Sequence, residues 1–200
     1  MTEYLVNYDG DLDFGGMVVT LDVRDGGAVD MRSGNVLNAG SASLAIEANS
    51  VAVFASGFDP YAVFGSYTCA GITHFAGSTL TIPAGHNAVL RLKYSDRVVC
   101  AGSLKPLPDS FLDLDGGLEV LPDGFVDLGT AGQLYIHDDT SGMSGGQLFA
   151  RLTYIGGQTG ACFTQTAGTH TVALSVWIGR YGGTGSYALS GTGALSAQDE

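Results

Sequence analysis

The chain of 200 residues contains 31 Gly, 5 Pro and 3 Cys, and 45% of its residues are hydrophobic while only 14% are charged. Disorder requires low hydrophobicity with high charge, so this composition predicts a folded chain large enough for one core. The net charge of −12 argues against nucleic acid and anionic lipid as partners. The sequence has no run of about 18 apolar residues, so we expect no membrane insertion.

Three carboxylates alternate near the N-terminus, at Asp9, Asp11 and Asp13. Alternate carboxylates can converge on calcium, which prefers six to eight oxygen ligands. An EF-hand loop is excluded, because its Gly and Glu positions hold Phe14 and Thr20. Two interpretations remain, an exposed polar strand face and a calcium site in a turn. Calcium is the only cofactor that the sequence suggests.

Short alternating runs then follow one another, at 19–23, 29–31, 44–46 and 51–54, and each is followed by a turn segment that contains Gly, Asp or Asn. Such runs, bounded by turn residues, indicate β-strands. Windows with the apolar spacing of an amphipathic helix and without Gly or Pro are missing. The chain is therefore predicted to be all-β.

The clearest spacing lies in the middle of the chain, where successive apolar runs end at Leu114, Val120, Leu128 and Ile136. The steps of 6, 8 and 8 residues leave room for strands of three residues and short corners. This spacing favours a single right-handed parallel β-helix (β-solenoid) domain over residues 1–200, with three short strands in each coil of about 20 residues. Asp-Gly pairs such as 123–124 are typical of hairpins, so an antiparallel β-sandwich is the alternative.

Three segments do not fit this spacing and are predicted to be insertions that bulge from a corner, near 55–67, 103–110 and 138–146. The first contains Phe58, Tyr61, Phe64 and Tyr67, which recur every three residues. Either these rings form a carbohydrate-binding platform or they pack the insertion onto the coil. Insertions of this kind often carry the binding face of a solenoid.

The three cysteines are Cys69, Cys100 and Cys162, and their spacing excludes a zinc site. Each could be a small buried hydrophobic residue. Cys69 and Cys100 have similar surroundings, Thr-Cys-Ala-Gly and Val-Cys-Ala-Gly, so a disulfide between neighbouring coils is the second interpretation.

The C-terminal quarter carries a recognisable motif, Thr-Gly-Ala-Cys-Phe-Thr-Gln-Thr-Ala-Gly-Thr-His-Thr-Val at 159–172, continued over 176–197. It resembles the repeats of large secreted β-helix proteins with autotransporter-type or PEP-CTERM-type repeats. The resemblance covers about residues 157–200 and implies inward Phe163, Leu189 and Leu195, with Gln165 in a ladder. His170 is predicted to lie on the coil surface. Cys162 and Ala167 depart from the usual Thr and Gly of the motif.

Signals for catalysis are weak. The sequence has no phosphate-binding Gly-rich motif and no Gly-x-Ser-x-Gly segment predicted between a strand and a helix. Arg91 and Lys93 lie on one face of a predicted strand, an arrangement suited to an acidic sugar.

We therefore expect a non-catalytic, extracellular structural or adhesive β-helix module. Its expected partners are neighbouring repeats of the same chain, other copies end to end, and polysaccharide. A polysaccharide-binding or polysaccharide-degrading β-helix protein is one alternative, and a subunit of a β-solenoid filament or phage-type spike is another. The resemblance implies an extracellular or cell-surface location. The N-terminus has no signal peptide and the chain stops within the repeat, which suggests a fragment of a longer secreted protein.

Overall fold

The computed structural model describes residues 5–6, 11–90, 92–107, 109–138, 140–157 and 160–199. The fold is all-β, with parallel strands stacked as a β-solenoid of about eight turns. This confirms the predicted solenoid and sets aside the antiparallel sandwich. Where the sequence predicts one domain, the chain divides into two compact units, residues 1–78 with 86–89 and residues 79–85 with 90–200. Within the described residues, no helix is long and apolar enough to cross a membrane.

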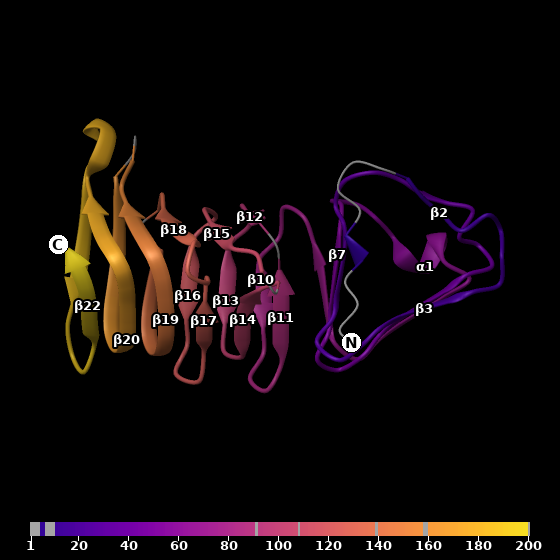
Figure 1. Ribbon diagram of the computed structural model, residues 1–200, viewed down its shortest axis with the longest axis horizontal. Coiled ribbons are helices and arrows are strands. Elements are labelled where there is room, and N and C mark those ends of the chain that lie inside the picture. Colours follow the sequence, from indigo (N-terminus) through magenta and orange to yellow (C-terminus); the bar gives the residue numbers. More distant parts are fainter. Residues whose placement is uncertain are drawn as a thin grey trace. The chain divides into compact units, whose positions relative to one another are not determined.

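Unit 1 contains three turns and the start of a fourth (Figure 1). Its elements, in chain order, are β1 (Leu5–Val6), β2 (Leu12–Asp13), β3 (Thr20–Val23), β4 (Ala28–Met31), β5 (Val36–Leu37), β6 (Ser43–Ile46), β7 (Val51–Phe54), α1 (Pro60–Val63), β8 (Ser66–Cys69) and β9 (Ile72–Phe75). Three parallel sheets form its sides, with the strand orders β1-β4-β7-β9, β2-β5 and β3-β6-β8. The predicted runs at 19–23, 29–31, 44–46 and 51–54 correspond to β3, β4, β6 and β7.

The short helix α1 stands in the third turn at the place that β2 and β5 hold in the first two turns. Pro60 begins the helix, and the Asp59 carboxylate caps it by accepting a hydrogen bond of 3.0 Å from the Tyr61 backbone N–H. Pro at the first helical position and Asp at the cap are both favourable there. The segment 55–65 therefore fills one side of the third turn and does not lengthen it, because Val51 pairs with Ile72 after 21 residues, whereas Ala28 pairs with Val51 after 23.

The remaining strands, seen side by side in Figure 1, belong to unit 2 except for residues 87–89, which cluster with unit 1. They are β10 (Leu80–Ile82), β11 (Asn87–Leu90), β12 (Leu92–Tyr94), β13 (Val98–Cys100), β14 (Ser103–Pro106), β15 (Leu112–Leu114), β16 (Leu118–Val120), β17 (Phe125–Asp127), β18 (Gln133–Ile136), β19 (Ser141–Ile155), β20 (Ala161–Ile178), β21 (Gly185–Leu189) and β22 (Ala194–Asp199), with a 3-10 turn at Arg180–Gly182.

Three sides can be followed through unit 2. The first side contains β10, β13, β16, the first part of β19 and of β20, and β21. The second contains β11, β14, β17, the middle parts of β19 and β20, and β22. The third contains β12, β15, β18 and the last parts of β19 and β20. Strands β19 and β20 each run along all three sides, so they bend at the corners through register shifts.

Two predicted insertions are corrected by this register. Within 103–110, residues 103–106 form β14, where Leu104 pairs with Val126. Within 138–146, residues 141–146 open β19, where Met143 pairs with Val120. These segments are rich in Ser, Gly or Pro and lack a full apolar alternation, but their inward side chains continue the core of the preceding turn.

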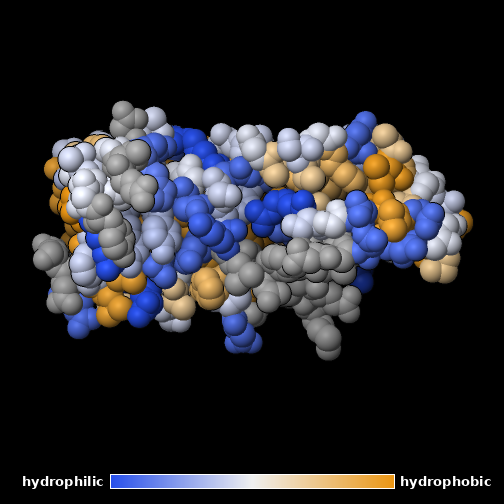
Figure 2. Space-filling model, turned by 90° about the horizontal axis from the view of Figure 1, so that it is seen from above, coloured by the Kyte–Doolittle hydropathy of each residue, from blue (hydrophilic) through white to orange (hydrophobic). Residues whose placement is uncertain are grey.

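Charge is unevenly distributed along the chain. Residues 1–50 contain eight acidic and two basic residues, whereas residues 140–198 contain no acidic residue and two arginines, Arg151 and Arg180. Figure 2 shows hydrophilic side chains over much of this face, with apolar side chains at its left edge, where the C-terminal strands lie, and again toward its right edge. Acidic residues are thus absent from 140–198 and return only at Asp199, in β22, and at Glu200.

Candidate functional site

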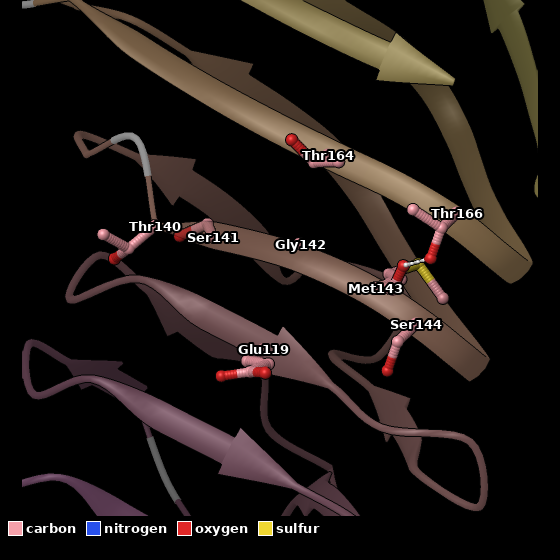
Figure 3. Close-up of a pocket in the computed structure, with 8 residues that line it drawn as sticks. All are labelled: Glu119, Thr140, Ser141, Gly142, Met143, Ser144, Thr164 and Thr166. Atoms are coloured by element: carbon pink, nitrogen blue, oxygen red, sulfur yellow. Dashed lines mark hydrogen bonds between the residues drawn. The ribbon is translucent and has the colours of Figure 1, made fainter. Parts of the chain in front are cut away.

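A shallow hollow of about 260 Å³ opens on the outer surface of the first side of unit 2 (Figure 3). Its lining comes from β16, β19 and β20 and is dominated by hydroxyl groups: Glu119, Thr140, Ser141, Gly142, Met143, Ser144, Thr164 and Thr166. Period-two alternation directs Glu119, Ser144, Thr164 and Thr166 outward, whereas Leu118, Val120, Ser141 and Met143 are buried at the inward positions. We call this hollow the hydroxyl groove.

Gly142 forms the floor of the hydroxyl groove. It is the register partner of Glu119 on one neighbouring strand and of Thr164 on the other. A Cβ atom at Gly142 would lie 2.3 Å from the Thr164 carbonyl oxygen, a distance that side chains do not tolerate. Only glycine fits here, because the neighbouring Thr164 backbone occupies the position of a side chain, and the floor of the groove consists of backbone atoms.

Arg97 holds the rim of the groove in place. Its guanidinium donates hydrogen bonds of 2.9 Å to the Glu119 carboxylate and 2.8 Å to the Thr140 hydroxyl. Asp138 lies 3.8 Å from the same guanidinium and accepts hydrogen bonds of 2.7 Å from the hydroxyls of Thr140 and Ser141. The result is a network in which one cation serves two carboxylates and fixes the Thr140 side chain at the groove.

The charge state of this rim follows from its contacts. Partial burial raises the pKa of the Asp138 carboxyl, but the hydroxyls of Ser141 and Thr140 and the charge of Arg97 outweigh it, so the pKa is lowered from its usual value. Asp138 is therefore ionised at neutral pH. With Glu119 beside it, the rim presents anionic and hydroxyl oxygens together with N–H and O–H donors.

Residues 142–146 spell Gly-x-Ser-x-Gly, with Ser144 at the edge of the groove. The nucleophile elbow of hydrolases requires this motif on a sharp turn from a strand to a helix. Here the five residues lie within strand β19. The motif is therefore part of the ladder, and Ser144 is an outward ladder residue.

The predicted carbohydrate platform in unit 1 is not formed as an exposed surface. Phe64 and Tyr67 are buried, and Phe58 stacks on the core ring of Phe54 with centroids 4.8 Å apart. Only Tyr61 is widely exposed, at 73%. The rings instead pack α1 and its flanks onto the turn, which was the other interpretation of the spacing.

The N-terminal carboxylates are bound by amides of the next turn. Asp11 accepts a hydrogen bond of 2.8 Å from the Asn35 side chain, and Asp13 accepts one of 2.8 Å from Asn38. The bonds from Asn38 and from the Gly15 N–H lower the pKa of Asp13. Asp9 lies outside the described residues. In the described part of the chain no three His, Cys, Asp or Glu side chains gather as a metal site, and calcium binding stays a prediction.

The predicted pairing of Cys69 with Cys100 is corrected, because all three cysteines are free thiols. Cys69 pairs in register with Ile46, whereas Cys100 lies between Ile82 and Val120. Cys100 is fully buried, which raises the pKa of its thiol to about 11. It is a small core residue, as the first interpretation has it. Cys69 and Cys100 each end a strand, β8 and β13, which explains their similar flanking residues, but the two strands belong to different sheets.

An aromatic stack on the third side was missed by the sequence analysis. Tyr135, Tyr154 and Trp177 are register partners on β18, β19 and β20. The rings of Tyr135 and Tyr154 lie parallel with centroids 4.9 Å apart, and the Arg180 guanidinium lies 4.2 Å from the centroid of Trp177. Tyr154 follows Tyr135 by 19 residues, and Trp177 follows Tyr154 by 23 residues. Because the spacing is unequal, the sequence shows no repeat that would align the three rings.

A second missed feature is a polar network inside the C-terminal turns. His170, predicted to lie on the surface, is buried, with Nε2 3.1 Å from the Thr153 hydroxyl and Nδ1 3.0 Å from the Tyr187 hydroxyl. Tyr187 in turn donates to the Gln165 side-chain oxygen, and the Gln165 amide donates to the Gly168 and Ala194 carbonyls. Burial lowers the pKa of His170 to about 3 and raises that of Tyr187. His170 is therefore neutral at physiological pH.

Comparison with protein-family models, with curated proteins and with solved structures gives no match for this chain.

Proposed function

We propose that this chain is a non-catalytic, extracellular adhesive module that binds a neutral polysaccharide along the outer surface of its solenoid. The observation that carries the proposal is the hydroxyl groove, in which three threonines, Ser144 and Glu119 surround the backbone of Gly142. Sugar hydroxyls both donate and accept hydrogen bonds, and so do the hydroxyls of this lining. The resemblance of residues 157–200 to secreted repeat proteins supports the extracellular setting.

The charges at the groove favour a neutral sugar over an acidic one. Arg97, the cation at the rim, is already engaged by Glu119 and Asp138. Lys93, which the sequence suggested for an acidic sugar, forms an ion pair of 2.7 Å with Asp115, and Arg91 lies outside the described residues. An acidic sugar would therefore be repelled by Glu119 and Asp138, because the Arg97 charge is already paired with these two carboxylates. The net charge of −12 adds to this repulsion.

The experiment is a calorimetric titration of the intact chain with soluble cello-, manno- and chito-oligosaccharides and with oligogalacturonate. We expect at least one neutral series to bind and oligogalacturonate not to bind. Glu119→Gln removes the charge and one acceptor oxygen at the groove, and Thr164→Val removes one hydroxyl. Each substitution is expected to weaken binding about fivefold, since a lost hydrogen bond to a ligand costs roughly 1 kcal/mol.

Thr169→Val is the matched control, because Thr169 is an exposed threonine of the same strand on the second side. It should bind as the unaltered chain does. The proposal is wrong if no neutral series binds, or if the groove variants and the control bind equally. Release of reducing ends during a long incubation would overturn the non-catalytic part and favour a polysaccharide-degrading protein.

A further inference from the structure

Strand β8 is an open edge in the interior of the chain. It pairs with β6 on one side, and among the described residues no strand pairs with it on the other. The strands from β10 onward pair with one another instead, as Leu80 does with Val98. The edge therefore arises at residues 66–69, where the ladder of unit 1 is complete and the chain goes on to form a second ladder.

The side chains of β8 are mostly exposed. Cys69 continues an inward column in which its register partner Ile46 is 2% exposed, yet Cys69 itself is exposed. The two outward residues of β8 are exposed as well. Tyr67 is buried, and its ring lies 5.1 Å, centroid to centroid, from that of Tyr61, which is 73% exposed. At β8 the backbone N–H and C=O groups of a strand edge therefore lie beside an aromatic cluster.

The edge lacks the features that normally prevent pairing with another chain. Exposed edge strands are usually protected by Lys, Pro or a bulge. The sequence of β8 is Ser-Tyr-Thr-Cys, and residues 60–90 contain no Asp, Glu, Lys or Arg. Two copies with a net charge of −12 each repel one another, but an uncharged edge adds no local repulsion. The absence of charge therefore favours a second copy of this chain over a strongly basic or acidic partner.

We propose that β8 pairs with β8 of a second copy, so that the chain forms a two-fold dimer through unit 1. Two identical edges can pair only in the antiparallel sense, because a parallel pair joins opposite edges of its two strands. Such a contact uses the same surface on both copies, so assembly stops at the dimer. The dimer does not depend on the proposed sugar binding.

The alternation of side chains along β8 selects the register of the pair. Inward residues must face inward residues, because a shift by one residue turns the core side chains toward solvent. Tyr67 opposite Tyr67 would crowd two large rings, and Cys69 opposite Cys69 would pair only one residue of each β8. Tyr67 opposite Cys69 joins a large side chain to a small one and pairs three residues of each strand. Thr68 then lies on the two-fold axis and faces Thr68 of the second copy.

Sedimentation velocity of the intact chain in reducing buffer, over a wide concentration range, tests the dimer. We expect an equilibrium between monomer and dimer without larger species. Thr68→Lys places like charges opposite each other and should raise the dissociation constant of the dimer at least about fivefold. Thr169→Lys makes the same change at an exposed threonine of unit 2 and should dimerise like the unaltered chain. A chain that stays monomeric, species larger than a dimer, or an equal effect of the two substitutions overturns the proposal.

A charge exchange tests the position of the two-fold axis. Thr68→Glu alone should dimerise as weakly as Thr68→Lys, whereas an equimolar mixture of the two should form heterodimers, because unlike charges then face each other. Circular dichroism verifies that both variants keep their β content. If the mixture dimerises no better than either variant alone, Thr68 does not face its own copy and the proposal is wrong.

A disulfide provides the closest measurement of the register. Thr68→Cys, combined with Cys69→Ala and Cys162→Ala, should form a cross-linked dimer under mild oxidation. Opposed residues of antiparallel strands have Cα atoms about 4.5–5.5 Å apart, which lies within the range that a disulfide spans. Thr169→Cys in the same background is the matched control and should remain largely unlinked. Equal cross-linking of the two variants, or none in Thr68→Cys, contradicts the proposed pairing.

Discussion

The turns from β13 to β18 and the turns from β19 to β22 share one backbone ladder but differ in what fills it. In the earlier turns the inward positions hold fully buried apolar groups, such as Val98, Leu118 and Leu134. In the later turns the column of Val120 reaches Gln165, and the column of Leu134 reaches Thr153. The same backbone pattern thus accepts either an apolar interior or a hydrogen-bonded one.

The two interiors are stabilised by different interactions. The earlier turns rely on apolar area removed from water, which is worth about 25 cal/mol per Å². The later turns contain buried polar atoms that contribute only while each has a partner, because a buried group without one costs about 1–3 kcal/mol. The C-terminal turns should therefore be sensitive to pH and to the loss of single hydrogen bonds, and the earlier turns to cavities.

The largest expected effect is a cavity in the apolar turns. Leu118→Ala removes a fully buried side chain and should lower the free energy of unfolding by about 2–5 kcal/mol. Leu195→Ala, in a strand covered on one side, should cost well under half as much because Leu195 is partly exposed. Urea denaturation of both variants measures the difference. Equal losses would show that the last turn is as well packed as the others.

Acid is expected to act on the C-terminal turns. The pKa of His170 is about 3 in the folded chain and about 6.5 when unfolded, so the unfolded chain binds the proton first as pH falls. The contribution of His170 to stability is complete above pH 6.5 and is lost toward pH 3, at up to about 1.4 kcal/mol per pH unit.

Stability measured at pH 7 and pH 4 in the unaltered chain and in His170→Gln isolates this contribution. The unaltered chain should lose about 3 kcal/mol more than the variant over this range. Hydrogen exchange locates the loss, which should show first in amides of 161–178 and later in those of 98–120. The same pH dependence in both proteins would mean that other groups, and not His170, account for it.

Loss of Gln165 should be the next largest effect. Gln165→Leu leaves the Tyr187 hydroxyl and the Gly168 and Ala194 carbonyls without their partner. A loss of about 1–3 kcal/mol is expected in chemical denaturation. Gln147→Leu is the control, because Gln147 is exposed on the neighbouring strand and should change stability by less than about 0.5 kcal/mol. If the two variants are equally stable, the polar interior contributes nothing.

The smallest effect concerns the aromatic stack. Tyr154→Leu removes the parallel contact with Tyr135 and the contact with Arg180. Aromatic pairs contribute about 0.5–1.5 kcal/mol beyond their buried area, and the expected loss lies in that range. A double-mutant cycle with Tyr135→Leu separates the pair from the rest. A coupling energy of zero would mean that the rings are only neighbours.

Much of the ladder could be predicted because alternation and corner residues are local signals. The runs ending at Leu114, Val120, Leu128 and Ile136 coincide with β15 to β18 to within one residue. The opening of β19 was misassigned as an insertion because Gly142 and its neighbours carry few apolar side chains. What makes that segment a strand is the close approach of Thr164, which lies one turn later in the chain.

The candidate site depended almost entirely on long-range pairing. His170 is polar in isolation, and its two partners, Thr153 and Tyr187, are each 17 residues away. The groove needs Glu119, Gly142 and Thr164 from three successive turns. Local spacing pointed instead to the rings of the segment 58–67, of which Tyr61 alone is widely exposed. The number of residues in each turn varies along the chain, so the sequence alone could not show that Glu119, Gly142 and Thr164 lie side by side.

The direction of the ladder bonds has a mechanical consequence for unit 2. Parallel strands of successive turns are joined by hydrogen bonds that run along the stack, as between Ser141 and Phe163. A force on the C-terminus along the stack acts parallel to these hydrogen bonds. It therefore breaks the bonds of one turn at a time and does not shear a whole sheet at once. Each released turn, at about 20 residues, lengthens the chain by roughly 70 Å. The C-terminal turns would extend stepwise under small forces and re-form when the force is removed.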